Sequence, residues 1–184
     1  MIKAKISKNI TYHGRVSLKI RNADGTVIKQ IKYKNKGCEP LFRFVAYAFA
    51  GEYANAEAIR PFKLRLFNYN SANVPEGAPD VENMKPITGY MSINKPAKVV
   101  SSTTTVLHFL VPYAFLDTND SQEINLICLY GIDRKDLSNN GGYCAYIYLT
   151  DPDNPDQFKP LEINDNQKEN YSLSIEWELS VDNE

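Results

Sequence analysis

"YSLSIEWELSVDNE", residues 171–184, alternates apolar and polar side chains with a period of two. The apolar positions are Tyr171, Leu173, Ile175, Trp177, Leu179 and Val181, and the positions between them carry Ser, Glu and Asp. This alternation is typical of a β-strand with one buried face. The sequence therefore predicts a core strand here, with Leu173, Ile175, Trp177 and Leu179 in the hydrophobic core.

Other β-rich segments follow one another along most of the chain. We predict strands at 14–21, 26–33, 62–67, 87–93, 99–112, 123–131, 143–150 and 161–163. The first two flank Asn22-Ala23-Asp24-Gly25, and Asp-Gly between strands predicts a hairpin because Gly readily adopts the positive φ of a tight turn. The segments lie too close together for repeated helical crossovers, so the sheets should be mostly antiparallel. The expected fold class is mainly β, an antiparallel β-sandwich or jelly-roll-like fold with one short helix.

The one predicted helix lies in "EPLFRFVAYAFAG", residues 39–51. Pro40 suits the first helical turn, and Gly51 suits a C-terminal cap. Apolar residues recur between them at steps of three and four, which gives one apolar stripe. From this stripe we assign to the core Leu41, Phe44, Val45 and Phe49.

Length and composition indicate a single globular domain. The chain has 184 residues and a net charge of -1, and we expect an N-terminal arm at 1–13 followed by one domain at 14–184. That charge gives no basic field for nucleic acid, and no segment is apolar enough to predict a signal peptide or a membrane span. The three cysteines, Cys38, Cys128 and Cys144, are widely spaced, so we expect reduced, buried thiols and synthesis in a cytoplasm.

The sequence offers few groups for catalysis. His13 and His108 do not have the spacing of a metal pair, and no nucleophile motif or phosphate-binding loop is present. Glu176 and Glu178 could form a glycosidase-like pair, but their strand face also carries Ser and Asp, which favours a solvated surface. "DPDNPD" at 151–156 could offer oxygens to Ca²⁺, but it lacks the Gly and Glu of an EF-hand loop, which favours a plain turn. We expect no enzymatic activity, catalytic residue, metal or cofactor.

Three tyrosines in the predicted strand 143–150 carry the main alternative. Tyr143, Tyr146 and Tyr148 could contribute to the core or to an interface, or they could stack on sugar rings. The second interpretation predicts a carbohydrate-binding β-sandwich or a receptor-binding protein. The arm, the Pro-containing loop at 70–86 and the loop at 151–160 are candidate contact elements with partner proteins.

The order of these segments resembles that of a known group of proteins. Asn35 and Gly37 precede the apolar helix that ends at Gly51, a strand follows Arg60-Pro61, and Ile175–Leu179 closes the domain. This plan resembles the small β-sandwich virion structural proteins of tailed bacteriophages, among which crAss-like and related gut phages are a candidate group. The resemblance implies a capsid auxiliary or decoration protein, or a neck, tail-ring or fibre-attachment subunit. Such a protein would form homo-oligomers and bind other virion proteins in the particle, after synthesis in the host bacterial cytoplasm.

Overall fold

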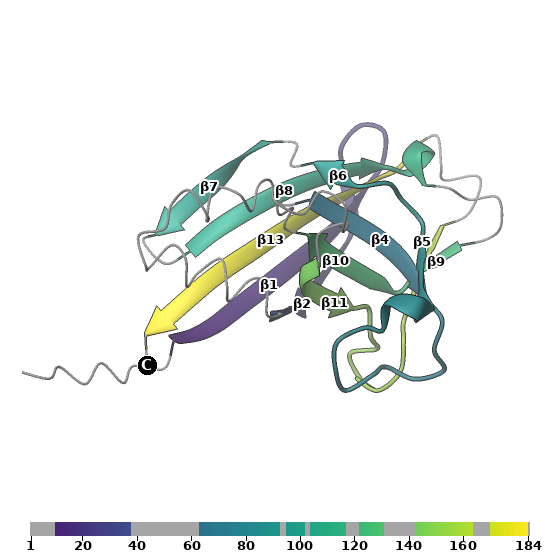
Figure 1. Cartoon of the computed structure of the whole chain (residues 1–184). Helices are drawn as coiled ribbons and strands as arrows, with labels where there is room; N and C mark the ends of the chain where they lie inside the picture. Colours follow the sequence, from purple (N-terminus) through teal and green to yellow (C-terminus); the bar gives the residue numbers. More distant parts are fainter. Residues whose placement is uncertain are drawn as a thin grey trace, which may run out of the picture.

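The computed structural model describes residues 10–37, 63–92, 95–101, 104–116, 122–130, 143–163 and 170–183, and these residues form a mainly β, antiparallel, sandwich-like fold (Figure 1). The strands are β1 (Ile10–Arg21), β2 (Val27–Lys34), β3 (Lys36–Gly37), β4 (Lys63–Tyr69), β5 (Met84–Pro86), β6 (Met91–Ser92), β7 (Lys95–Ser101), β8 (Thr104–Pro112), β9 (Gln122–Ile124), β10 (Leu126–Tyr130), β11 (Tyr143–Tyr148), β12 (Leu161–Ile163) and β13 (Ser172–Asn183). Two 3-10 turns, η1 (Val81–Asn83) and η2 (Tyr113–Phe115), connect strands. The predicted fold class is confirmed.

Two predictions fall partly or wholly outside this description. The helix expected over 41–50, with its core residues Leu41, Phe44, Val45 and Phe49, lies outside the described residues. The boundary of the arm changes, because β1 begins at Ile10 and its first residues already pair with β13. Residues 10–13 therefore belong to the sheet, while residues 1–9 are not described.

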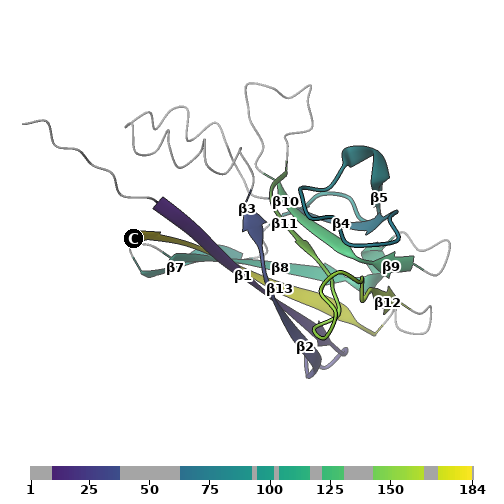
Figure 2. The ribbon, with the colours of Figure 1, turned by 90° about the horizontal axis from the view of Figure 1, so that it is seen from below.

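The strands form two main sheets that pack face to face. Sheet A has the order β2-β1-β13-β8-β7, and sheet B has the order β3-β11-β10-β4-β5, with β6 also paired to β4. Every strand pair is antiparallel, and β9 and β12 form a separate small pair. Figures 1 and 2 show that sheet A extends beyond sheet B at the end where β13 finishes.

β13, the strand predicted from the alternation at 171–181, is the central strand of sheet A. β13 pairs with β1 along its whole length and with β8 on its other side. Leu173, Ile175 and Trp177 are fully buried in the core between the sheets, as predicted. Leu179 is only partly buried and packs against the margin of this core.

The β1–β2 hairpin forms where the Asp-Gly signal predicted it. Gly25 has φ of 86°, which a residue with a side chain rarely adopts. Its backbone N–H donates to the carbonyl of Asn22 over 3.0 Å, and the side chain of Asp24 accepts from the N–H of Thr26 over 2.7 Å. These bonds fix a tight turn and set the register of the hairpin.

The chain passes from sheet A to sheet B at Asn35. This residue lies between β2 and β3, and its backbone N–H donates to the carbonyl of Gly14 over 3.1 Å. The Asn35 amide packs against the α-carbon of Gly14 so closely that a β-carbon at position 14 would collide with it. Gly37 then pairs with Ala145 of β11. The Asn-x-Gly of the sequence thus marks the crossover between the two layers.

Candidate functional site

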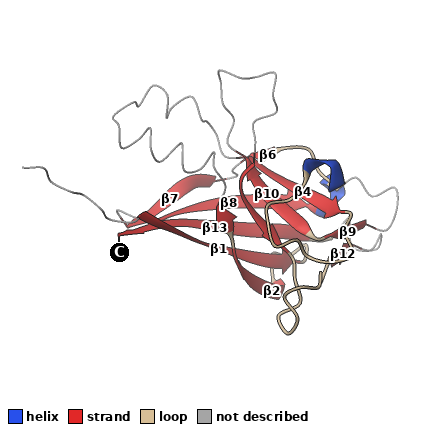
Figure 3. Ribbon diagram, turned by 60° about the horizontal axis from the view of Figure 1, so that its bottom comes forward, coloured by secondary structure: helices blue, strands red, loops and turns tan. Residues whose placement is uncertain are grey.

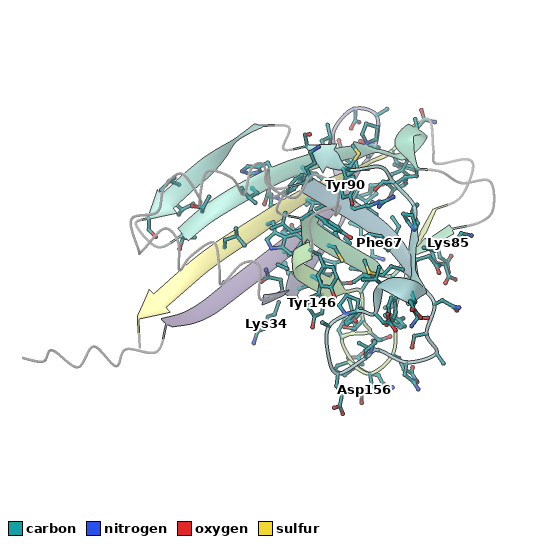
Figure 4. The ribbon with its side chains drawn as sticks, viewed as in Figure 1. Lys34, Phe67, Lys85, Tyr90, Tyr146 and Asp156 are labelled. Carbon is teal, nitrogen blue, oxygen red and sulfur yellow. The ribbon has the colours of Figure 1, made fainter. Side chains whose placement is uncertain are left out.

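Sheet B is covered on both faces. All five residues of β10 are buried, which requires a covering layer on each side of the strand. Ile127 and Leu129 belong to the core shared with sheet A, whereas Leu126, Cys128 and Tyr130 face the other way. We call the second layer the aromatic cluster; it consists of Phe67, Tyr69, Leu126, Cys128, Tyr130, Tyr146 and Tyr148, with Val74, Met84, Tyr90, Tyr143 and Phe158 packed against it. Figure 4 labels Phe67, Tyr90 and Tyr146 of this set.

The three tyrosines that sequence reasoning selected all belong to this cluster. Tyr146 and Tyr148 are 4% and 7% exposed, and Tyr143 is half-buried. Tyr146 packs edge-on against both neighbours, with ring centroids 6.1 Å from Tyr143 and 5.4 Å from Tyr148. The rings therefore form a second core layer, and Tyr146 and Tyr148 offer no open ring face of the kind that sugar stacking requires.

The two loops that are candidate contact elements with partners fold back over this cluster. The long segment between β4 and β5 and the segment 151–160 are held against the sheet by tyrosine hydroxyls and by each other. The hydrogen bonds are Tyr143 Oη to the carbonyl of Pro79 (2.7 Å), Tyr148 Oη to the carbonyl of Gly77 (3.4 Å), the N–H of Asp80 to Tyr69 Oη (3.2 Å) and the N–H of Val74 to the carbonyl of Asp156 (3.0 Å). The loops thus act as a lid of backbone and side chains over an apolar face.

Arg65 is a part of this layer that the sequence analysis missed. Its guanidinium carbon lies 4.8 Å from the ring centroid of Tyr90 and 5.5 Å from that of Phe67. Its Nε donates to the carbonyl of Thr88 over 2.9 Å. The cation–π contacts and this bond stabilise a charge on an otherwise apolar face. The available signal was the strand alternation, which places Arg65 on the same face as Phe67.

Burial also changes the acidity of the cluster. It is the main cause that raises the pKa of Tyr130 and of Tyr148 above the usual value, with further contributions from neighbouring Cys128 and from other tyrosines. Arg65 opposes the shift at Tyr130. These hydroxyls therefore stay protonated at neutral pH, and the Tyr148 hydroxyl donates a hydrogen bond to the carbonyl of Gly77 in the covering loop.

The candidate catalytic carboxylates lie on the solvent side of sheet A. Glu176 accepts a hydrogen bond from Lys19 Nζ over 2.7 Å and forms a salt bridge across the strand pair. Glu178 lies opposite Arg15 of β1 in the strand register. Both side chains are half-buried, and Lys19 and Arg15 of β1 lie beside them on the same face, which fits cross-strand charge pairs at a surface.

The 151–156 segment is organised by its own groups. Asp151 accepts from the N–H of Asp153 over 2.9 Å and pairs with Lys159 Nζ over 3.0 Å. The bond from Asp153, followed by Lys159, lowers the pKa of Asp151. Among the described residues, no group of three or more His, Cys, Asp or Glu side chains is placed to hold a metal ion.

The histidines and cysteines considered as candidate site residues lie on different elements. His108 lies on β8, opposite Glu176 in the register, and His13 lies in β1. Cys128 is a buried cysteine of the aromatic cluster that takes part in no disulfide, as predicted. Cys38 and the side chain of Cys144 are outside the described part of the chain.

Exposed apolar side chains gather on the two outer strands of sheet A. No described strand pairs with the free edge of β2 or of β7. Val27 and Ile28 on β2 are 41% and 55% exposed, and Val99 and Val100 on β7 are 71% and 57% exposed. Figure 3 shows these two strands at opposite margins of the sheet. An open sheet edge with apolar side chains is a surface that another chain can cover.

Comparison of the chain with models of known protein families, with curated proteins and with solved structures found no match. Within the part of the chain that the structure describes, no helix has the length and apolar character needed to cross a membrane.

Proposed function

We propose that this chain is a non-enzymatic structural subunit that acts by protein–protein assembly. The observation that carries the proposal is that no described strand covers the outer edges of sheet A, where Val99 and Val100 of β7 and Val27 and Ile28 of β2 are exposed. Isolated surface valines are ordinary, but valines on a strand whose outer edge no described strand covers combine two reasons for association. A neighbouring strand added at either edge would pair the backbone and cover the side chains.

The proposed setting is the virion of a tailed bacteriophage. It rests on the resemblance of the segment order to small β-sandwich virion proteins, and it implies a capsid auxiliary, neck or tail subunit. In this setting the partners are copies of the chain and other virion proteins, without nucleic acid or membrane. A ring would form when one surface patch meets a different patch on the next copy and the rotation closes.

Assembly through the edge is tested by introducing a charge there. Val99→Lys should weaken self-association or incorporation into particles, because a lysine on an edge strand opposes further strand pairing. Val81→Lys is the matched control, because Val81 is 70% exposed but lies in η1, before β5 of sheet B, and not on β2 or β7. Light scattering after size-exclusion chromatography, over a range of concentrations, measures the effect. Equal behaviour of both variants and the parent protein would refute the role of this edge.

The virion setting has a separate test. Quantitative mass spectrometry of purified particles, scaled to the most abundant capsid protein, should find the chain at a fixed stoichiometry. A high ratio would indicate a capsid decoration, whereas about a dozen copies would indicate a neck or tail ring. Absence from purified particles would refute the virion role.

A further inference from the structure

A polar cleft of about 510 Å³ opens at one end of sheet B. It lies where β4 ends, beside β9 and the segment 157–160, and Figures 1 and 2 show β5 and β9 at this same end of the molecule. Five side-chain amides and one carboxylate line it: Asn68, Asn70, Asn73, Asn125, Gln157 and Glu123. Among the described residues that line it, none is Lys, Arg or His.

The walls of the cleft are fixed by hydrogen bonds. The buried side chain of Asn125 bonds to both the N–H and the carbonyl of Tyr69, and Asn68 Nδ2 donates to the carbonyl of Glu123 over 3.0 Å. Ser71 Oγ donates to the carbonyl of Asn73 over 2.7 Å, which closes the turn after β4. A ligand would therefore meet a pre-organised surface and would have little ordering to impose on it.

Other polar groups in the cleft are open to a ligand. Asn70, Asn73 and Gln157 are exposed, and their side-chain amides form no hydrogen bond with any described residue. Each amide offers a donor and an acceptor side by side, which matches a pair of neighbouring hydroxyl groups. Phe158 adds a half-buried ring, packed at 6.3 Å from the ring of Tyr69.

We propose that this cleft binds a neutral saccharide. The described lining, rich in amides and without a cation, suits a ligand of many hydroxyl groups and no charge, and the carboxylate of Glu123 opposes anionic sugars. Phe158, which lines the cleft, supplies an apolar contact of the kind that sugar ring faces make. The site is distinct from the tyrosines of β11 that the sequence suggested, and it does not depend on the proposed assembly.

Glycan binding by the full chain tests the proposal. A printed array of neutral oligosaccharides of glucose, mannose, galactose, xylose and N-acetylglucosamine, with sialylated and sulfated glycans for comparison, should show retention on neutral glycans. Calorimetry with the best-retained oligosaccharide should then give 3- to 10-fold weaker binding for Asn73→Ala and for Gln157→Ala, about the loss expected for one hydrogen bond. Gln30→Ala is the control outside the cleft, because it removes an exposed amide of β2 in sheet A, which donates to Ser17 Oγ over 2.9 Å.

Thermal unfolding should change little for all three variants, since each side chain is exposed and the bond that Gln30 makes to Ser17 lies at the surface. The proposal is refuted by no retention on any glycan, by binding that Asn73→Ala and Gln157→Ala leave unchanged, or by preference for the sialylated or sulfated glycans. Retention on neutral glycans together with loss in only the two cleft variants supports it.

Discussion

Replacing Trp177 by Ala should remove a large share of the stability of this domain. The side chain is fully buried between β1 and β8, where its register partners are Val16 and Leu107. An aromatic side chain buries about 150–250 Å², which at about 25 cal/mol per Å² contributes about 4–6 kcal/mol. Truncations of this kind cost about 3–5 kcal/mol in measured cores, out of a total stability of about 5–15 kcal/mol. We expect a loss of about 3–5 kcal/mol for Trp177→Ala.

Urea unfolding followed by far-UV circular dichroism measures this loss, because Trp177 is the only Trp and its fluorescence disappears with it. Val99→Ala serves as the control, since Val99 is 71% exposed and should change stability by less than about 0.5 kcal/mol. Trp177→Phe should cost less than the Ala variant, because it keeps most of the ring volume and removes an indole N–H that has no partner among the described residues. A loss below about 1 kcal/mol for Trp177→Ala would refute the central place of this residue in the core.

Three further predictions concern the cluster and the crossover. Tyr143→Phe removes the bond to the carbonyl of Pro79 and should cost about 1 kcal/mol and speed proteolysis of the loop between β4 and β5; an unchanged cleavage rate would contradict the covering role. Gly14→Ala should cost about 1–3 kcal/mol in urea unfolding, because its β-carbon displaces the Asn35 amide, and adding Asn35→Ala should recover part of this loss. The free energy of unfolding should fall as the pH rises above about 10, because the unfolded chain then loses a tyrosine proton that folded Tyr130 retains. A free energy of unfolding that does not change between about pH 9 and 12 would contradict the raised pKa of Tyr130.

Much of the fold was predictable because a strand with one buried face has alternating apolar and polar residues in its sequence. The alternation at 171–181 predicted β13, and Asp24-Gly25 predicted the hairpin, since backbone geometry restricts the residues that such positions accept. The segment at 161–163 was predicted with the same bounds as β12. Boundaries were less accurate for strands that end at irregularities. The prediction at 123–131 joined β9 to β10 across Asn125, whose side chain bonds to β4 and which belongs to neither strand.

The second core layer was harder to predict, because its cover comes from distant loops. Residues 126–130, LICLY, are apolar at every position, which is typical of a strand with two covered sides. The sequence did not indicate that the covering material is the polar, Pro-containing segment after β4, since that depends on bonds such as that from Tyr143 to Pro79. For the same reason Tyr146 was predicted as a candidate for an interface or a ligand site. The amides at 68–73 were the signal for the cleft, but only the fold brings Gln157 to them.

The residues that stabilise the domain differ from those proposed to bind a neighbouring chain or a saccharide. The loops cover the aromatic face of sheet B, and the edges of sheet A and the cleft are distinct surfaces. The β7 edge and the cleft share no residue and belong to different sheets, so their substitutions should act independently. Val99→Lys should then retain any saccharide binding, and Asn73→Ala should retain self-association. If a folded single variant lost both saccharide binding and self-association, the two interactions would share one surface. That result would contradict the placement of the β7 edge and the cleft on separate surfaces.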